Sequence, residues 1–280
     1  MNLVCQENVI PFVLDVAASL TAFTPPNHIA YLCSWGFARL SPCCNSNYFG
    51  YKCLCLLAGL FLLPAQANVN ADDYHEFWLW SAVRPQAVLA QAQSLYILQG
   101  QVSERRGQSL FIPQGITVPR LRHGQIWLTY RVETLHWSDA IFMSIAQQLT
   151  RWQKQGNPVV GIQIDFDART LRMQQYVAFL QRLRQQLPAH YALSITGLLD
   201  WSNNSSPEVV NQLNGIVDEV IVQTYQGRQT IKNYAAYLPR LAQLRIPFKI
   251  GLVQHGEWQA PHYLATAPFF RGYVVFLVND

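Results

Sequence analysis

The chain lacks the residue patterns of several common kinds of chemistry. All six cysteines precede residue 56, and the 225 residues that follow contain none. No cysteine or histidine pair has the spacing of a zinc site, so we expect neither a metal nor another cofactor. A Gly-x-Gly-x-x-Gly turn and a Walker A sequence are missing, which disfavours a nucleotide-binding sheet. No Gly-x-Ser-x-Gly elbow is present, which disfavours a serine hydrolase.

An apolar run early in the chain has the features of a secretory signal. Lys52 precedes the run Cys53–Leu63, and an Ala-x-Ala site ends at Ala67. This order predicts a signal peptide cleaved after Ala67, since the run is too short for an ordinary membrane span. The signal starts more than forty residues into the chain. We therefore expect residues 1–45 to be a non-native leader from a misplaced start site, and residues 46–67 to be the signal peptide; a genuine leader is the alternative.

Cleavage after Ala67 would leave residues 68–280, whose 213 residues suit one domain. This part has a net charge of +4, from 18 basic and 14 acidic residues. The basic residues are scattered, so nothing predicts a nucleic-acid partner. An exported domain without cysteine fits a bacterial periplasm, where folding need not depend on disulfides. We expect a periplasmic or secreted monomer that keeps no membrane span after cleavage.

Eight short apolar runs recur along this domain, and several are almost continuously hydrophobic, as is typical of parallel strands covered on the outside. They predict strands at Glu76–Ala82, Leu95–Gln99, Gln125–Val132, Val159–Phe166, Ala192–Leu198, Glu219–Tyr225, Phe248–Val253 and Gly272–Val278.

The connections between these strands are mostly helical in pattern. Helices are predicted from Ser138 to Gln155, from Thr170 to Leu187, after Ser206, and from Thr230 to Leu244. Two connections, Arg106–His123 and Gly256–Phe269, contain several prolines and glycines and are predicted to be loops. The sequence therefore predicts a small (β/α)₈ TIM-type barrel with weak or missing helices after strands 2, 7 and 8. An open doubly wound sheet is the alternative.

The fourth predicted strand carries the main candidate site. Because side chains alternate along a strand, Gln163, Asp165 and Asp167 share the inner face and lie towards its C-terminal end. Carboxylates are rarely buried without a partner or a function, and the C-terminal ends of barrel strands converge on one pocket. Asp165 and Asp167 are therefore candidate catalytic residues. The structural alternatives for Asp165 are an ion pair with Arg131 or a hydrogen bond with Tyr225, and the alternative for Asp167 is the N-cap of the next helix.

Other strand ends would add amides, a cation and aromatic rings to the same pocket. Such a mixture is typical of sugar sites, where polar groups bind hydroxyls and aromatic faces stack on the ring. The candidate substrate-binding residues are Tyr225, Gln163, Gln223, Arg131, Trp201, Trp80 and His255. The alternatives are a pair between Arg131 and Glu133, amides that satisfy polar groups of the barrel interior, and tryptophans that only pack.

The fourth strand resembles the strand-four signature of the chitinase-like family-18 glycoside hydrolases, Asp-Gly-x-Asp-x-Asp-x-Glu. Laid on Val160–Asp167, the signature matches at Gly161 and Asp165, whereas Val160 and Gln163 replace two of its aspartates. Asp167 stands in the place of the final glutamate, the general acid of that family. The resemblance implies Asp167 as the acid and Asp165 as the residue that orients the acetamido group of the substrate. Tyr225 resembles that family's strand-six tyrosine, although Gln226 replaces the acid that usually follows it.

The sequence also resembles the bacterial domain-of-unknown-function family 3142 over Tyr74 to Asp280. The segments Gly161–Ala168 and Leu193–Trp201 carry this resemblance, with support from Phe248–Leu252 and Val274–Leu277. The resemblance implies an exported barrel without an assigned activity. The leading hypothesis is a glycoside-hydrolase-like protein acting on a glycan. The alternatives are a non-catalytic glycan-binding barrel and an interaction scaffold in the cell envelope.

Overall fold

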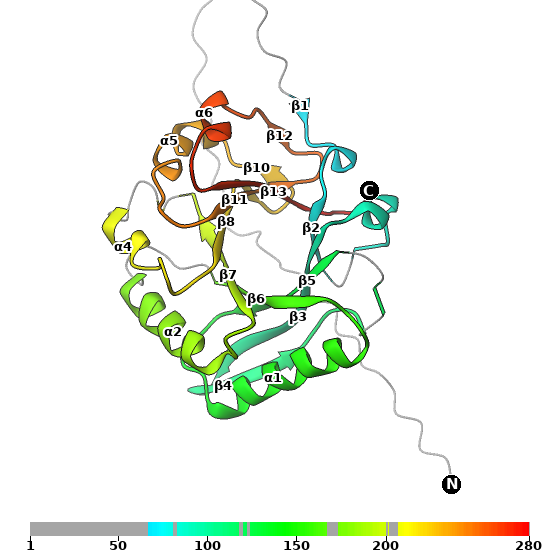
Figure 1. Ribbon diagram of the computed structural model, residues 1–280, viewed down its shortest axis with the longest axis vertical. Coiled ribbons are helices and arrows are strands. Elements are labelled where there is room, and N and C mark those ends of the chain that lie inside the picture. Colours follow the sequence, from blue (N-terminus) through cyan, green and yellow to red (C-terminus); the bar gives the residue numbers. More distant parts are fainter. Residues whose placement is uncertain are drawn as a thin grey trace, which may run out of the picture. The chain divides into compact units, whose positions relative to one another are not determined.

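Eight parallel strands form a closed ring in the computed structural model, which describes residues 67–80, 83–117, 120–121, 124–166, 173–199, 201 and 207–279. Neighbours in the ring follow the order of the chain, and the first strand also pairs with the last, through Val275 opposite Phe77. The predicted (β/α)₈ barrel is therefore confirmed, and the open sheet is excluded (Figure 1).

The barrel strands lie close to their predicted positions. They are β2 (Glu76–Leu79), β3 (Ser94–Arg105), β5 (Gln125–Val132), β6 (Val159–Asp165), β7 (Ala192–Leu198), β8 (Glu219–Gln223), β11 (Phe248–Val253) and β13 (Phe270–Phe276). Three of them, β5, β7 and β11, have the predicted bounds. The strand β3 continues six residues past the predicted end at Gln99.

The extension of β3 belongs to a hairpin that the sequence analysis missed. The segment Arg106–His123, predicted to be a loop, contains β4 (Gln108–Pro113), which pairs antiparallel with the end of β3. Arg106 and Gly107 turn the chain with φ values of +51° and +75°, the left-handed conformation that a two-residue hairpin turn requires. The prediction was wrong because the prolines and glycines of this segment suggested a loop, whereas Arg-Gly is not a typical hairpin-turn sequence.

The prediction of a loop over Gly256–Phe269 was also wrong in part. It contains the short strand β12 (Glu257–Trp258), which pairs antiparallel with β1 (Ala67–Asn68), and the one-turn helix α6 (His262–Ala265). A hydrogen bond from the backbone N–H of Val69 to the carbonyl of Gly256, at 2.8 Å, extends this pairing. Contacts with a distant segment stabilise β12, so its local sequence alone does not indicate a strand.

Helices α1 (Asp139–Lys154), α2 (Met173–Gln186) and α4 (Pro207–Asn211) lie outside the ring of strands (Figure 1). In α1, Ile141, Ile145, Leu149 and Trp152 are buried at the spacing of one helix face. Ser138 precedes α1 as predicted, but its side chain makes no capping hydrogen bond. No helix among the described residues is long and apolar enough to cross a membrane.

The prediction of a single helix over Thr230–Leu244 was wrong. The chain forms the 3-10 turn η4 (Tyr234–Ala236) and the short helix α5 (Leu238–Leu241) instead. Asn233 takes a left-handed conformation with φ +62°, and Pro239 lies at the start of α5. Both residues interrupt a continuous helix. A small hairpin, β9 (Tyr225–Gln226) and β10 (Gln229–Thr230), links β8 to this region.

Large aromatic side chains fill the interior of the barrel. Tyr96 stacks on Trp127 at 5.6 Å with 10° between the ring planes, and Trp78 lies beside Tyr96. A Cβ atom at Gly251 would lie 2.7 Å from the ring of Trp78, so Trp78 requires glycine there. A Cβ atom at Gly161 would lie 2.1 Å from the carbonyl oxygen of Ala192 on the neighbouring strand and 2.9 Å from the ring of Trp127, so the close backbone is the main reason for glycine at that position.

A buried ionic cluster closes the N-terminal end of the barrel. Lys249 Nζ lies 2.6 Å from Glu76 Oε2 and 3.1 Å from Glu219 Oε2, and it donates a 3.0 Å hydrogen bond to the hydroxyl of Tyr96. That hydroxyl donates in turn to Glu219 Oε1 at 2.7 Å. Burial lowers the pKa of Lys249, but the charges of Glu219 and Glu76 outweigh it, so the pKa is raised overall. Burial raises the pKa of Glu76 despite the charge of Lys249.

Candidate active site

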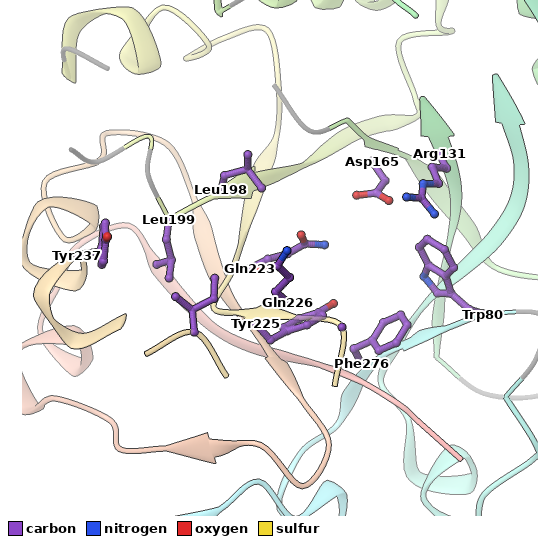
Figure 2. A pocket seen from close by; sticks show the side chains of 12 residues that line it. Trp80, Arg131, Asp165, Leu198, Leu199, Gln223, Tyr225, Gln226, Tyr237 and Phe276 are labelled. Atoms are coloured by element: carbon purple, nitrogen blue, oxygen red, sulfur yellow. The ribbon is translucent and has the colours of Figure 1, made fainter. Parts of the chain in front are cut away.

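The C-terminal ends of the strands surround a cavity of about 650 Å³ (Figure 2). Six of its lining residues lie at or next to the ends of β5, β6, β7, β8 and β13, and Trp80 directly follows β2. The lining residues are Trp80, Arg131, Asp165, Leu198, Leu199, Gln223, Tyr225, Gln226, Gly227, Ile231, Tyr237 and Phe276. The cavity therefore lies at the end of the barrel where (β/α)₈ enzymes keep their active sites.

Asp165 is the last residue of β6 and lines this cavity (Figure 2). The hydroxyl of Thr196, on the neighbouring strand β7, donates a 2.8 Å hydrogen bond to Asp165 Oδ1. Asp165 is the only carboxylate among the cavity-lining residues that the structure describes. The predicted inward orientation of this side chain agrees with the structure, whereas its catalytic role stays a prediction.

An aromatic wall forms one side of the cavity. The ring of Phe276 lies 5.6 Å from that of Trp80 and 5.6 Å from that of Tyr225. Tyr225 also contacts Trp78 in the barrel interior, at 6.3 Å. Burial raises the pKa of the Tyr225 hydroxyl well above its ordinary value, and the negative charge of Asp165 raises it further. The hydroxyl of Tyr225 therefore stays protonated across the physiological pH range and can donate a hydrogen bond.

Arg131 lies at the edge of the cavity, on the strand next to Asp165 (Figure 2). Its guanidinium carbon is 5.8 Å from the centre of the Trp80 ring, a cation–π contact. The carboxylate of Glu133 accepts a 2.6 Å hydrogen bond from Gln101, and among the described residues no ion pair joins it to Arg131. Among the ion pairs of the described residues, none joins Arg131 to Asp165. The two pairings weighed as structural alternatives for these residues are therefore not formed.

Gln163 lies beneath the cavity and is fully buried. Its Oε1 accepts hydrogen bonds from Trp78 Nε1 at 2.6 Å and from Thr129 at 3.2 Å, and its Nε2 donates to Ser194 at 3.0 Å. These bonds satisfy the side-chain amide within the barrel. The structure therefore favours the structural interpretation of Gln163, whereas Gln223 lines the cavity directly.

Two predicted binding residues do not line the cavity. Trp201 is 2% exposed, and its ring lies 6.4 Å from that of Tyr176 on α2, within the core between barrel and helices. His255 is exposed and follows β11, where its φ of +65° turns the chain towards β12. The Trp201 side chain therefore packs in this core and does not line the cavity. The second predicted acid, Asp167, lies outside the described residues.

Several residues at or beside the cavity were not singled out from the sequence. Thr196, the hydrogen-bond partner of Asp165, lies two residues before the end of β7, and the alternation of that strand could have placed it on the inner face. Phe276, Ile231 and Tyr237 line the cavity, and no local pattern distinguishes them. Among the described residues, no three His, Cys, Asp or Glu side chains gather as a group able to hold a metal ion.

The fold and the cavity define a (β/α)₈ barrel with an acidic and aromatic site at the C-terminal ends of its strands. Residues 128–243 match the model of the family described as "Domain of unknown function (DUF3142)". The predicted resemblance to this family is confirmed over that range, which includes Asp165, Thr196 and Tyr225. No curated protein matches the chain.

Solved structures similar to this chain come from Bacillus cereus, Clostridium difficile and Scadoxus multiflorus. The spore cortex-lytic enzyme SleL of Bacillus cereus is 17% identical, with a TM-score of 0.42 over 64% of this chain and 50% of its own. The chitinase domain of the spore coat protein CotE of Clostridium difficile is 12% identical, with a TM-score of 0.42. The match covers 69% of this chain and 68% of the CotE chain. The xylanase and alpha-amylase inhibitor XAIP-II of Scadoxus multiflorus is 12% identical, with a TM-score of 0.46. The match covers 72% of this chain and 92% of the inhibitor chain.

The present chain thus spans about half the length of the Bacillus enzyme. The assignment of the barrel rests on the register of its own strands rather than on these likenesses.

Proposed function

We propose that this protein is an exported glycoside-hydrolase-like protein that binds a glycan in the cavity and cleaves it there. The observation that carries the proposal is the position of Asp165, whose carboxylate lines the cavity beside the aromatic wall of Trp80, Phe276 and Tyr225. A carboxylate can accept hydrogen bonds from sugar hydroxyls, and the wall offers apolar faces to the ring. The predicted signal peptide would deliver the protein to the periplasm.

The proposed reaction assigns Asp167 as the general acid and Asp165 as its partner. Asp167 would give its proton to the glycosidic oxygen while the substrate's own acetamido oxygen attacks the anomeric carbon, so that the glycosidic bond breaks and the leaving sugar departs as an alcohol. Water would then open the cyclic intermediate and return a proton to Asp167. Asp165 would hold the acetamido group in place, and the Tyr225 hydroxyl could donate to its oxygen.

One observation favours a second candidate, a glycan-binding barrel without hydrolytic activity. Hydrolysis needs a group that can act as an acid and that reaches the glycosidic oxygen. An aspartate in place of glutamate at residue 167 shortens the reach of that acid by one methylene. Binding alone needs only the wall and the hydrogen-bonding groups. An envelope scaffold is the third candidate, and none of the contacts described here favours it.

A glycan array and a panel of chromogenic glycosides, with the purified full-length protein, separate these candidates. The enzyme hypothesis predicts turnover that Asp167→Asn abolishes and Asp165→Asn lowers by at least a hundredfold, since both acids act on the reacting sugar. Binding without turnover by the wild type would establish the second candidate.

A matched variant controls for loss of charge alone. Asp72 is exposed in the turn before β2, away from the cavity, so Asp72→Asn should leave both binding and turnover unchanged. Absence of any glycan binding by the folded wild type would refute the proposed function.

A further inference from the structure

Arg131 is a cation that the proposed chemistry does not use. Its side chain is exposed at the edge of the cavity, and the described residues give its guanidinium no ion pair and no hydrogen bond. The nearby carboxylates have other contacts, because Glu133 accepts from Gln101 and Asp165 accepts from Thr196. The guanidinium therefore retains donors that face solvent within a site built to bind a ligand.

The position of Arg131 is held by an aromatic ring. Trp80 lies under the guanidinium at 5.8 Å, and Phe276 packs edge-on against Trp80. One face of the indole is thus covered by the cation, so Trp80 acts as a positioning residue for Arg131 rather than as an open stacking platform. The rings of Tyr225 and Phe276 remain as the apolar surface for a sugar (Figure 2).

The two charged residues of the described cavity lining are neighbours across two strands, because Arg131 on β5 is the register partner of Asp165 on β6. The other described lining residues are amides, one glycine, and apolar and aromatic side chains. A planar guanidinium presents two parallel N–H donors that match the two oxygens of a carboxylate. Hydroxyl groups of the same ligand can donate to Asp165 beside it.

We infer that the cavity binds an acidic glycan and that Arg131 receives the carboxylate of a uronic-acid-type sugar. The inference rests on the proposed function and specifies its substrate class. Trp80 keeps the guanidinium extended over the indole, so that less side-chain freedom is lost when the ligand binds. Charge-assisted recognition of this kind at a half-open site predicts a preference of about tenfold for the acid over a neutral analogue.

Titration calorimetry with two matched probes tests this inference. A hyaluronan oligosaccharide carries both an acetamido sugar and a uronic acid, and its methyl ester loses the negative charge of each carboxyl group at the cost of one added methyl, while a chitin oligosaccharide serves as a neutral glycan. The wild type should bind the free acid about tenfold more tightly than the ester, with affinity falling as salt rises. Arg131→Gln should abolish that preference, because it weakens binding of the acid more than binding of the ester, while Arg131→Lys should retain part of the preference.

Two further variants separate positioning from general damage. Trp80→Leu should lower the affinity for the acid more than the affinity for the ester, and Trp80→Phe, which keeps an aromatic face, should restore most of the preference for the acid. Arg151→Gln, at an exposed site on α1, is the matched control and should have no effect.

The outcomes distinguish this inference from the proposed function. Binding of the chitin oligosaccharide that depends on Asp165, with equal affinity for acid and ester, would overturn the inference and leave the proposed function standing. A preference for the acid that survives Arg131→Gln would also overturn it, as would tighter binding of a sulfated, carboxylate-free carrageenan oligosaccharide than of the uronide. Binding of none of these probes would overturn it as well, and if the glycan array were also negative, the proposed function would fail with it.

Discussion

The hydroxyl of Thr196 donates a 2.8 Å hydrogen bond to Oδ1 of Asp165, across two neighbouring strands at the mouth of the barrel. The two residues lie 31 positions apart in the chain, and the parallel register of β6 and β7 brings them together. This bond orients the carboxylate towards the cavity. It links β6, which ends at the candidate catalytic residue Asp165, to the neighbouring strand β7.

Thr196→Val removes this donor while it preserves the shape of the side chain. We expect the protein to lose about 1 kcal/mol of stability, because one oxygen of a partly buried carboxylate loses a hydrogen bond. Glycan affinity should fall as well, since the carboxylate is less well oriented. Urea unfolding and titration calorimetry measure the two effects, and Thr196→Ser, which keeps the hydroxyl, should resemble the wild type. Equal affinity in the valine variant would show that the bond does not orient Asp165 for binding.

Lys249→Met tests the ionic cluster at the opposite end of the barrel. The substitution leaves the carboxylates of Glu76 and Glu219 without their shared cation, and we expect a loss of about 3 kcal/mol in the free energy of unfolding. Urea denaturation measures the loss, with Lys154→Met on α1 as the exposed control. A second substitution, Glu219→Gln, should recover part of the loss in the Lys249→Met background. A loss no larger than that of the control would mean that the cluster contributes little.

The same cluster predicts a loss of stability in alkali. The folded-state pKa of Lys249 is raised above its ordinary value of 10.5, so the stability that its charge contributes is present below pH 10.5. It is lost as the pH rises through the folded-state pKa. The difference in unfolding free energy between wild type and Lys249→Met should therefore stay constant from pH 7 to about 10 and shrink at higher pH. A difference that shrinks already near neutral pH would contradict this assignment.

Gly251→Ala tests the close packing inside the barrel. The new methyl group would lie 2.7 Å from the ring of Trp78, and we expect a cost of about 2 kcal/mol from overpacking. Trp78→Phe removes the outer ring that causes this clash, so the double variant should be more stable than the sum of the single effects predicts. Thermal unfolding of all four proteins provides the cycle. Additive effects would show that Trp78 does not limit the residue at position 251.

Trp201→Phe tests whether this residue only packs. Its ring is buried against Tyr176 and outside the cavity, so we expect lower stability, by about 1–2 kcal/mol, with unchanged glycan affinity. Trp80→Leu should show the opposite pattern, with a changed ligand preference and a smaller effect on stability. Weaker glycan binding in a folded Trp201→Phe protein would return this residue to the binding site.

The sequence was most informative where a local pattern decides the structure. The runs at Gln125–Val132, Ala192–Leu198 and Phe248–Val253 are strands with the predicted bounds, because each is a short, mostly apolar stretch rich in branched and aromatic residues. The alternation along Val159–Asp165 also placed Asp165 on the inner face. The Arg106–Gly107 turn and the break at Asn233 were missed, because both depend on left-handed backbone conformations at residues that adopt them only sometimes.

The amino-acid order by itself determined the succession of strands and helices, since hydrophobic periodicity acts over a few neighbouring residues. The tertiary structure alone decided which side chains meet: Trp78 with Gln163, Lys249 with Glu76 and Glu219, and Arg131 with Trp80. These pairs join residues that are far apart in the sequence, and their contacts depend on the register in which the barrel closes. A shift of one residue in any strand would turn its side chains to the other face, so the site exists only in the folded ring.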